Sequence, residues 1–193
     1  MATRGPYAKG VAKRDEILDA ALELFAQKGY DRTSVREIAR HASLSQAGLL
    51  HYFSTKEELF LEVLRRRDDR ITDPQEESHR HSVDRLIRAV ERNAHEPGLV
   101  RLFVAMSAES AEEDTDAHTF FAERYRWLLE QITEDILEHQ AAGDIAPTVP
   151  AEDIASLLVA AADGLQVQWL LDPGNVDMTA RLRALWETLR GAI

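Results

Sequence analysis

The chain contains no cysteine among its 193 residues, which excludes disulfide bonds, thiolate metal sites and a cysteine nucleophile. Residues 1–14 (MATRGPYAKGVAKR) lack the apolar segment of a secretory signal peptide. The most apolar stretch, residues 154–171, is interrupted by Asp163, Gln166 and Gln168, which argues against a membrane span. We therefore expect a cytoplasmic protein that does not associate with membranes.

The motifs of common enzyme classes are also missing. No P-loop, G-x-G-x-x-G, H-E-x-x-H or nucleophile elbow is present, and most Asp and Glu residues fall on polar helix faces. An enzyme is not expected, and neither is a cofactor or a bound metal. His79, His81 and Asp84 carry metal-ligating groups, but they lie in a polar segment without a fixed scaffold, which favours a solvated loop.

No segment shows the alternation of apolar and polar residues that is typical of a β-strand. Apolar residues instead recur every three or four positions, which predicts an all-α fold of about nine helices. The expected helices cover residues 14–30, 34–42, 45–53, 56–70, 82–94, 98–111, 118–142, 151–171 and 178–191.

The net charge of −11 is distributed unevenly. Residues 1–70 hold 13 Lys and Arg against 11 Asp and Glu, whereas residues 71–193 hold 10 against 23. Pro74 and its polar neighbours place a linker at 69–81, so we expect two domains, residues 11–71 and 72–193. Such asymmetry is common in helical proteins, but it also suits a first half that binds an anionic partner and a second half that faces away.

Residues 34–53 (SVREIARHASLSQAGLLHYF) predict two short helices joined by a tight turn, a helix-turn-helix. The apolar residues between 35 and 42 line one face of the first helix. Ser34 and Glu37 fit an S-x-x-E capping box, and Ser45 is expected to cap the second helix. Two short helices alone are a weak signal, and the flanking helices make it specific.

The full pattern is ILDAALELF-x-x-x-GY-x-x-TSV-x-x-IA-x-x-A-x-L-S-x-A-x-L-x-HYF-x-x-KEEL. It resembles the DNA-binding domain of the TetR (tetracycline-repressor) family over residues 11–71. The resemblance implies an N-terminal helix-turn-helix domain of three to four helices and a C-terminal helical domain for ligand binding and dimerisation. Two positions depart from the family pattern. Ser43 replaces the usual Gly of the turn, where a positive φ would be strained, and Leu50 replaces a Tyr that often reaches a phosphate.

The resemblance further implies a homodimeric repressor that a small apolar or amphipathic ligand releases from a palindromic operator. The expected partners are double-stranded DNA, a second copy of the chain and a small-molecule effector of unknown identity. Three alternatives stay open: an activator, a ligand-independent DNA-binding protein of the same fold, and a protein-interaction protein with a filled core.

If the second helix of the motif enters the major groove, Gln46 is placed to pair with adenine and Ala47 to contact a thymine methyl. Arg36 is placed to bind guanine, and His51 to reach a base edge or a phosphate. The expected DNA contacts are Thr33, Ser34, Arg36, Ser45, Gln46, Ala47, Gly48, His51, Tyr52 and Lys56. A basic arm that follows the DNA backbone or enters a minor groove is expected from Arg4, Lys9, Lys13 and Arg14.

The second half carries large apolar and aromatic residues along two neighbouring helices, together with polar groups that can orient a ligand. The expected ligand contacts are Phe103, Met106, Phe121, Tyr125 and Gln166. A stripe of this kind is more often helical core than pocket wall, so core packing is the competing interpretation.

The last two expected helices have apolar faces that require a partner. The expected dimer contacts are Leu158, Leu165, Trp169, Leu182, Leu185, Trp186 and Leu189. The family resemblance implies that these helices form a four-helix bundle with the same pair from a second copy. The alternative is a monomer in which both are ordinary core helices.

Overall fold

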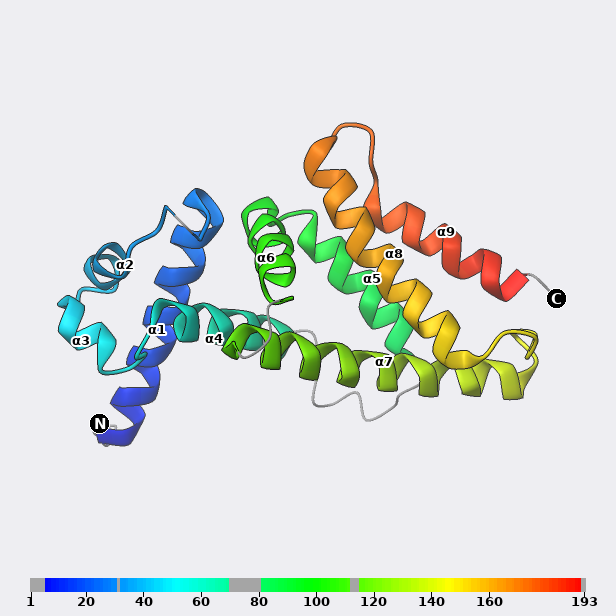
Figure 1. Cartoon of the computed structure of the whole chain (residues 1–193), viewed down its shortest axis with the longest axis horizontal. Helices are drawn as coiled ribbons and strands as arrows, with labels where there is room; N and C mark the ends of the chain where they lie inside the picture. Colours follow the sequence, from blue (N-terminus) through cyan, green and yellow to red (C-terminus); the bar gives the residue numbers. More distant parts are fainter. Residues whose placement is uncertain (1–5, 31, 70–80, 112–114, 192–193) are drawn as a thin grey trace, which may run out of the picture. The chain divides into compact units, whose positions relative to one another are not determined.

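The computed structural model describes residues 6–30, 32–69, 81–111 and 115–191, and in these ranges it contains nine α-helices and no strand (Figure 1). The prediction of an all-α fold is confirmed. The chain divides into two compact units, Met1–Arg70 and Ile71–Ile193. The linker predicted at residues 69–81 lies, apart from its two ends, outside the described residues.

The first unit is built on two long helices that pack against each other. Its helices are α1 (Pro6–Lys28), α2 (Val35–His41), α3 (Gln46–Leu50) and α4 (Lys56–Asp69). The rings of Phe25, Tyr30 and Phe60 lie 5.5 to 5.8 Å apart and join α1 to α4. Ile38 of α2 and Leu49 of α3 have no exposed surface, so both short helices are anchored on this core.

The hydrogen bonds that cap α2 and α3 each join two residues three positions apart in the sequence. The Ser34 hydroxyl accepts from the Glu37 N–H at 3.2 Å, and the Ser45 hydroxyl accepts from the Gly48 N–H at 3.0 Å. The predicted capping box is only half formed, because the Glu37 carboxylate pairs with Lys28 instead of accepting from the Ser34 N–H. Both predicted cap positions are confirmed.

The turn between α2 and α3 is a Schellman motif with serine at its left-handed position. The Leu44 N–H donates to the Ala39 carbonyl at 2.7 Å, and the Ser43 N–H donates to the Arg40 carbonyl at 3.2 Å. Ser43 has φ of 56°, a conformation that costs a residue with a Cβ about 1 kcal/mol. The strain expected from the missing glycine is therefore present.

The second unit is a helical bundle in which α8 contacts every other helix. Its members are α5 (Ser82–Asn93), α6 (Pro97–Glu109), α7 (Asp116–Ala142), α8 (Ala151–Leu171) and α9 (Met178–Gly191) (Figure 1). The core combines Ile87 of α5, Ile132 and Ile136 of α7, Leu158 of α8 and Leu182 of α9. The bounds of α8 and α9 agree with the predicted ranges.

Helix α8 is long and apolar enough to cross a membrane by length and composition, and it is the one helix of this kind in the described part of the chain. One side of it is packed inside the bundle, where Ala155 and Leu158 have no exposed surface. The opposite side is apolar and open, with Leu157 63% and Leu171 82% exposed. A core helix passes the same test of length and composition.

A buried carboxylate on α7 holds the first turn of α5. Asp135 is 1% exposed, and its Oδ2 accepts a hydrogen bond from the Val83 N–H at 2.9 Å. Its Oδ1 lies 3.8 Å from Nε2 of His139, beyond hydrogen-bond distance. Burial raises the pKa of the Asp135 carboxyl. The start of α5 is thus tied to α7 by one side chain.

Substituting Ser43 with glycine tests the strain in the turn. We expect Ser43→Gly to raise the free energy of unfolding by about 1 kcal/mol, because glycine adopts positive φ without a Cβ clash. Ser43→Ala is the control, since it removes the hydroxyl but keeps the Cβ, and it should give no gain. Chemical denaturation measures both, and a loss of stability in Ser43→Gly would contradict the assignment.

Candidate functional sites

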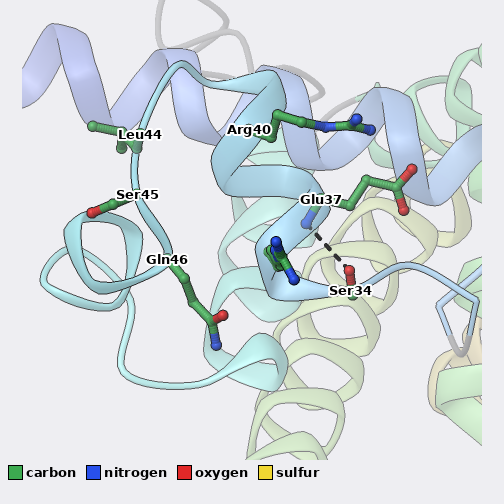
Figure 2. A pocket seen from close by; sticks show the side chains of 7 residues that line it. Ser34, Glu37, Arg40, Leu44, Ser45 and Gln46 are labelled. Carbon is green, nitrogen blue, oxygen red and sulfur yellow. Dashed lines mark hydrogen bonds between the residues drawn. The ribbon is translucent and has the colours of Figure 1, made fainter.

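The two short helices of the first unit enclose an open hollow of about 560 Å³ (Figure 2). It is lined by Ser34, Arg36, Glu37, Arg40, Leu44, Ser45 and Gln46. Arg36 and Arg40 are exposed on α2, and the Gln46 side chain extends from the first turn of α3. Guanidinium and amide groups of this kind bind phosphates and base edges.

Glu37 supplies the one carboxylate that lines this hollow, and nearby positive charges offset its negative charge. The hydrogen bond from Lys28, followed by the charges of Lys28, Arg40 and His41, lowers the pKa of the Glu37 carboxyl. Its ion pair with Lys28 offsets its negative charge. The hollow therefore presents the two arginines on α2 to an incoming anion.

Most of the predicted DNA contacts are accessible in the structure. Exposed members are Ser34, Arg36, Ser45, Gln46, Ala47 and His51, and half-buried ones are Gly48, Tyr52 and Lys56. Thr33 is the exception, because it is 1% exposed and its hydroxyl donates to the Gly29 carbonyl at 2.8 Å. That hydroxyl closes the turn after α1 and cannot reach a phosphate, so the prediction for Thr33 is wrong.

Two of the half-buried residues have structural contacts of their own. The Lys56 ammonium lies 3.9 Å from the centre of the Tyr30 ring, a cation–π geometry that fixes it at the start of α4. A Cβ on Gly48 would lie 3.2 Å from the Ser45 hydroxyl oxygen. Glycine at position 48 thus leaves room for the Ser45 hydroxyl that caps α3.

The basic arm predicted at the N-terminus is not an extended arm in the structure. Residues 6–13 continue α1 as helix, and the Lys13 ammonium donates to the Ala42 carbonyl at 2.8 Å. Arg14 forms a 2.5 Å ion pair with a glutamate of α4. Both side chains hold the first unit together. Arg4 lies outside the described residues, as does the side chain of Lys9.

Four of the five residues predicted to bind a ligand form one connected cluster with Asp163 in the second unit. The ring centres of Phe103 and Phe121 lie 5.5 Å apart, and those of Phe121 and Tyr125 lie 6.4 Å apart. The Tyr125 hydroxyl donates to Asp163 Oδ2 at 2.6 Å, and the Gln166 amide donates to Asp163 Oδ1 at 3.2 Å. Three helices, α6, α7 and α8, contribute to this cluster.

Asp163 is the residue that sequence reasoning missed as a site residue. It stood out only as an interruption in an apolar stretch, although a lone carboxylate in such a helix is itself a signal. Burial raises the pKa of the Asp163 carboxyl, and hydrogen bonds from Tyr125 and Gln166 act against this. The Arg124 guanidinium lies 5.0 Å from the centre of the Phe103 ring. The cluster thus joins a half-buried carboxylate to aromatic faces, one of which already holds a cation.

Four of the five predicted ligand contacts are 3–4% exposed and belong to the packed interior: Phe103, Met106, Phe121 and Gln166. The fifth, Tyr125, is half-buried. His79 lies outside the described residues, and His81 Nδ1 lies 3.6 Å from Asp84 Oδ2. No group of three metal-ligating side chains occurs among the residues that the structure describes.

Burial in one copy divides the predicted dimer contacts into two groups, and the dimer interface itself stays a prediction. Four of them fill the core of a single copy: Leu158, Leu165, Leu182 and Trp186. Three are half-buried against that core: Trp169, Leu185 and Leu189. A spacing of three and four residues marks the apolar positions of α8 and α9, but it does not separate the side that faces the core from the side that faces outward.

The outward side of α8 carries a different apolar stripe. It runs through Leu157, Ala160, Gly164, Val167 and Leu171, with alternating steps of three and four residues. Three of its members are open to solvent in one copy: Leu157, Leu171 and Val167, the last of which is 41% exposed. We call these five residues the α8 outer stripe.

Comparison with known proteins places both halves of the chain in one family. Residues 17–63 match the family described as bacterial regulatory proteins, tetR family. Residues 79–191 match the family described as BetI-type transcriptional repressor, C-terminal. The chain belongs to the TetR family. It is a DNA-binding transcriptional regulator with an N-terminal helix-turn-helix domain and a C-terminal helical domain, as the resemblance implied.

Individual TetR relatives match to different extents. RutR of Escherichia coli K12 is 44% identical over 64 residues, which are 33% of this chain and only 30% of RutR. PksA of Bacillus subtilis is 26% identical over 177 residues, or 86% of this chain and 82% of PksA. A transcriptional regulator from Saccharomonospora viridis, solved in complex with choline, has a TM-score of 0.72 and 26% identity and covers 91% of this chain and 94% of its own.

Removing the Tyr125 hydroxyl should increase the pH dependence of stability that Asp163 already causes. The folded-state pKa of Asp163 is raised above its ordinary value of 3.8, so ionisation costs stability above that pKa, and the cost disappears as pH falls through it. Tyr125→Phe removes one donor to the carboxylate and should lower the free energy of unfolding by about 1–3 kcal/mol at pH 7. The deficit should shrink as pH approaches 4.

Urea denaturation between pH 4 and pH 8 measures this effect. The double variant Tyr125→Phe/Asp163→Asn is the control, because without the carboxyl the deficit should no longer vary with pH. A deficit in Tyr125→Phe that stays constant over this range would show that the hydroxyl does not stabilise the ionised form.

Proposed function

We propose that this chain is a homodimeric repressor that binds a palindromic operator and leaves it when a small organic cation binds. The observation that supports DNA reading most directly is the hollow between α2 and α3, with Arg36, Arg40 and Gln46 on its walls. In this proposal Gln46 pairs with adenine in the major groove, and the arginines of α2 bind phosphates or guanine. The similarity of residues 79–191 to BetI-type repressors favours repression over activation.

The proposed dimer buries the α8 outer stripe against the same stripe of a second copy. Alternating steps of three and four residues are the pattern of helices that pack along their length. Ala160 and Gly164 at the centre allow the two backbones to approach closely, while Leu157 and Leu171 remove apolar surface from water at the ends. A two-fold dimer doubles the DNA contacts and selects a palindrome, whose half-sites lie about 34–36 Å apart.

The proposed effector is an amphipathic organic cation that binds beside Asp163. The carboxylate supplies the counter-charge, and Phe103, Phe121 and Tyr125 supply aromatic faces. Arg124 lies over the Phe103 ring, and this geometry supports a preference of the cluster for positive charge. Choline, which is bound to the Saccharomonospora viridis regulator, is a ligand of this class. Binding of ligand and operator would oppose each other through a coupling of about 1–3 kcal/mol.

Selection of bound sequences from a random DNA pool tests the DNA-binding part of this proposal. We expect an enriched palindrome whose affinity falls steeply with salt. Gln46→Ala should relax the preference at one base pair of each half-site by about 5- to 150-fold. Gln27→Ala, an exposed glutamine on α1, is the control and should keep the preference. If no sequence is enriched, the proposal of sequence-specific binding fails.

Sedimentation analysis tests the dimer. Leu157→Glu places a charge in the α8 outer stripe and should convert the dimer into a monomer that keeps its helical content. Leu137→Glu is the matched control, because Leu137 is an exposed leucine of α7, 52% exposed, outside the stripe. A Leu157→Glu protein that remains dimeric would move the interface elsewhere.

Calorimetric titration with choline tests the effector class. Binding should require the ionised carboxylate, so affinity should fall as pH drops through the raised pKa of Asp163. Asp163→Asn should weaken binding by at least about tenfold and remove this pH dependence, whereas Asp153→Asn, an exposed position of the same helix, should not. The neutral isostere 3,3-dimethyl-1-butanol should bind more weakly, and equal binding would exclude a cation site.

A further inference from the structure

Leu50 is a large apolar side chain on the outward side of the short helix α3. It is 38% exposed, whereas its neighbour Leu49 has no exposed surface. Leu50 follows Gln46 by four residues and Ala47 by three, so the three side chains share one helix face. Both other members of this face are exposed. More than a third of the surface of Leu50 is therefore open to solvent and available to a partner.

The chemistry of the major groove suggests what this side chain contacts. Leucine can neither donate nor accept a hydrogen bond, so it cannot hold a phosphate or the polar edge of a base. The C5 methyl of thymine is the one apolar group that the bases present in that groove. Burying leucine against it removes apolar surface of both partners from water. Where related domains often carry a tyrosine that reaches a phosphate, this chain has a group suited to a base.

We propose that Leu50 is a specificity-determining residue that selects thymine at one position of each operator half-site through its C5 methyl. The inference rests on the proposed function, in which the exposed side of α3 faces the major groove. Four residues of helix span about 6 Å, close to two base steps of about 3.4 Å. The thymine should therefore lie within about two base pairs of the adenine that Gln46 pairs with.

Single replacements of thymine by deoxyuridine test this directly, because they remove only the methyl group. The operator from the pool selection is synthesised with each thymine of one half-site replaced in turn, and dissociation constants are measured by fluorescence anisotropy. At one position the replacement should weaken binding by the wild-type chain about three- to tenfold. Leu50→Ala should bind the unmodified operator as weakly as the wild-type chain binds the deoxyuridine operator, and it should not respond to the replacement there.

Two controls separate this effect from general loss of binding. Val11→Ala removes another exposed apolar side chain of the same unit, on α1, and should keep both the affinity and the deoxyuridine effect. Gln46→Ala should weaken binding but keep the deoxyuridine effect, since the methyl contact belongs to a different residue. The salt dependence of Leu50→Ala should equal that of the wild-type chain, because no phosphate contact is lost.

The possible failures are distinguishable. If every deoxyuridine replacement has the same effect on the wild-type chain and on Leu50→Ala, the assignment of Leu50 is overturned while sequence-specific binding stands. If the sensitive thymine depends on residue 47 instead, shown by loss of the effect in Ala47→Gly alone, the assignment is also overturned. If the wild-type chain selects no sequence, the proposed function itself fails.

Discussion

The second unit depends on α8, a helix whose sides face three different environments. Helix α8 buries Leu158 among the helices of its own unit, pairs Asp163 with Tyr125 of α7, and leaves Leu157 open to solvent. An amphipathic helix normally has one apolar and one polar side. Here two sides are apolar and the polar groups lie between them. The core, the proposed effector site and the proposed dimer contact are therefore features of a single helix.

The parts of the fold that the sequence predicts are those set by interactions between neighbouring residues. Helix caps and turns are local, because a Ser34 or Ser45 hydroxyl bonds to an N–H three residues later, and such hydrogen bonds can be inferred from neighbouring residues alone. The positive φ at Ser43 follows from its place after α2 in the same way. The bounds of α8 and α9 were predictable because Pro150 and the Asp172–Gly174 segment interrupt the helical pattern.

Two differences between expectation and structure depend on contacts between distant segments, and one is local. The local case is Thr33, whose hydroxyl bonds to the Gly29 carbonyl four positions earlier and closes the turn that follows α1. Lys13 looks like part of a free basic arm, yet it bonds to a carbonyl 29 positions away. The orientation of α8 is fixed by partners such as Tyr125, 38 positions from Asp163. The spacing of apolar residues contains no information on which neighbouring helix a given helix face will contact.

The hydrogen bond between Asp135 and the Val83 N–H has a consequence for the start of α5. Among the residues that the structure describes, α5 is the first helix of the second unit, and its opening turn has no earlier helix of that unit to support it. A free helix end would unravel there, since its first N–H groups have no partner within the helix. The buried Asp135 carboxylate supplies such a partner from α7, the helix that also carries Tyr125 ten residues earlier, about 15 Å away. The first turn of α5 and the carboxylate of Asp163 are thus both hydrogen-bonded to side chains of α7.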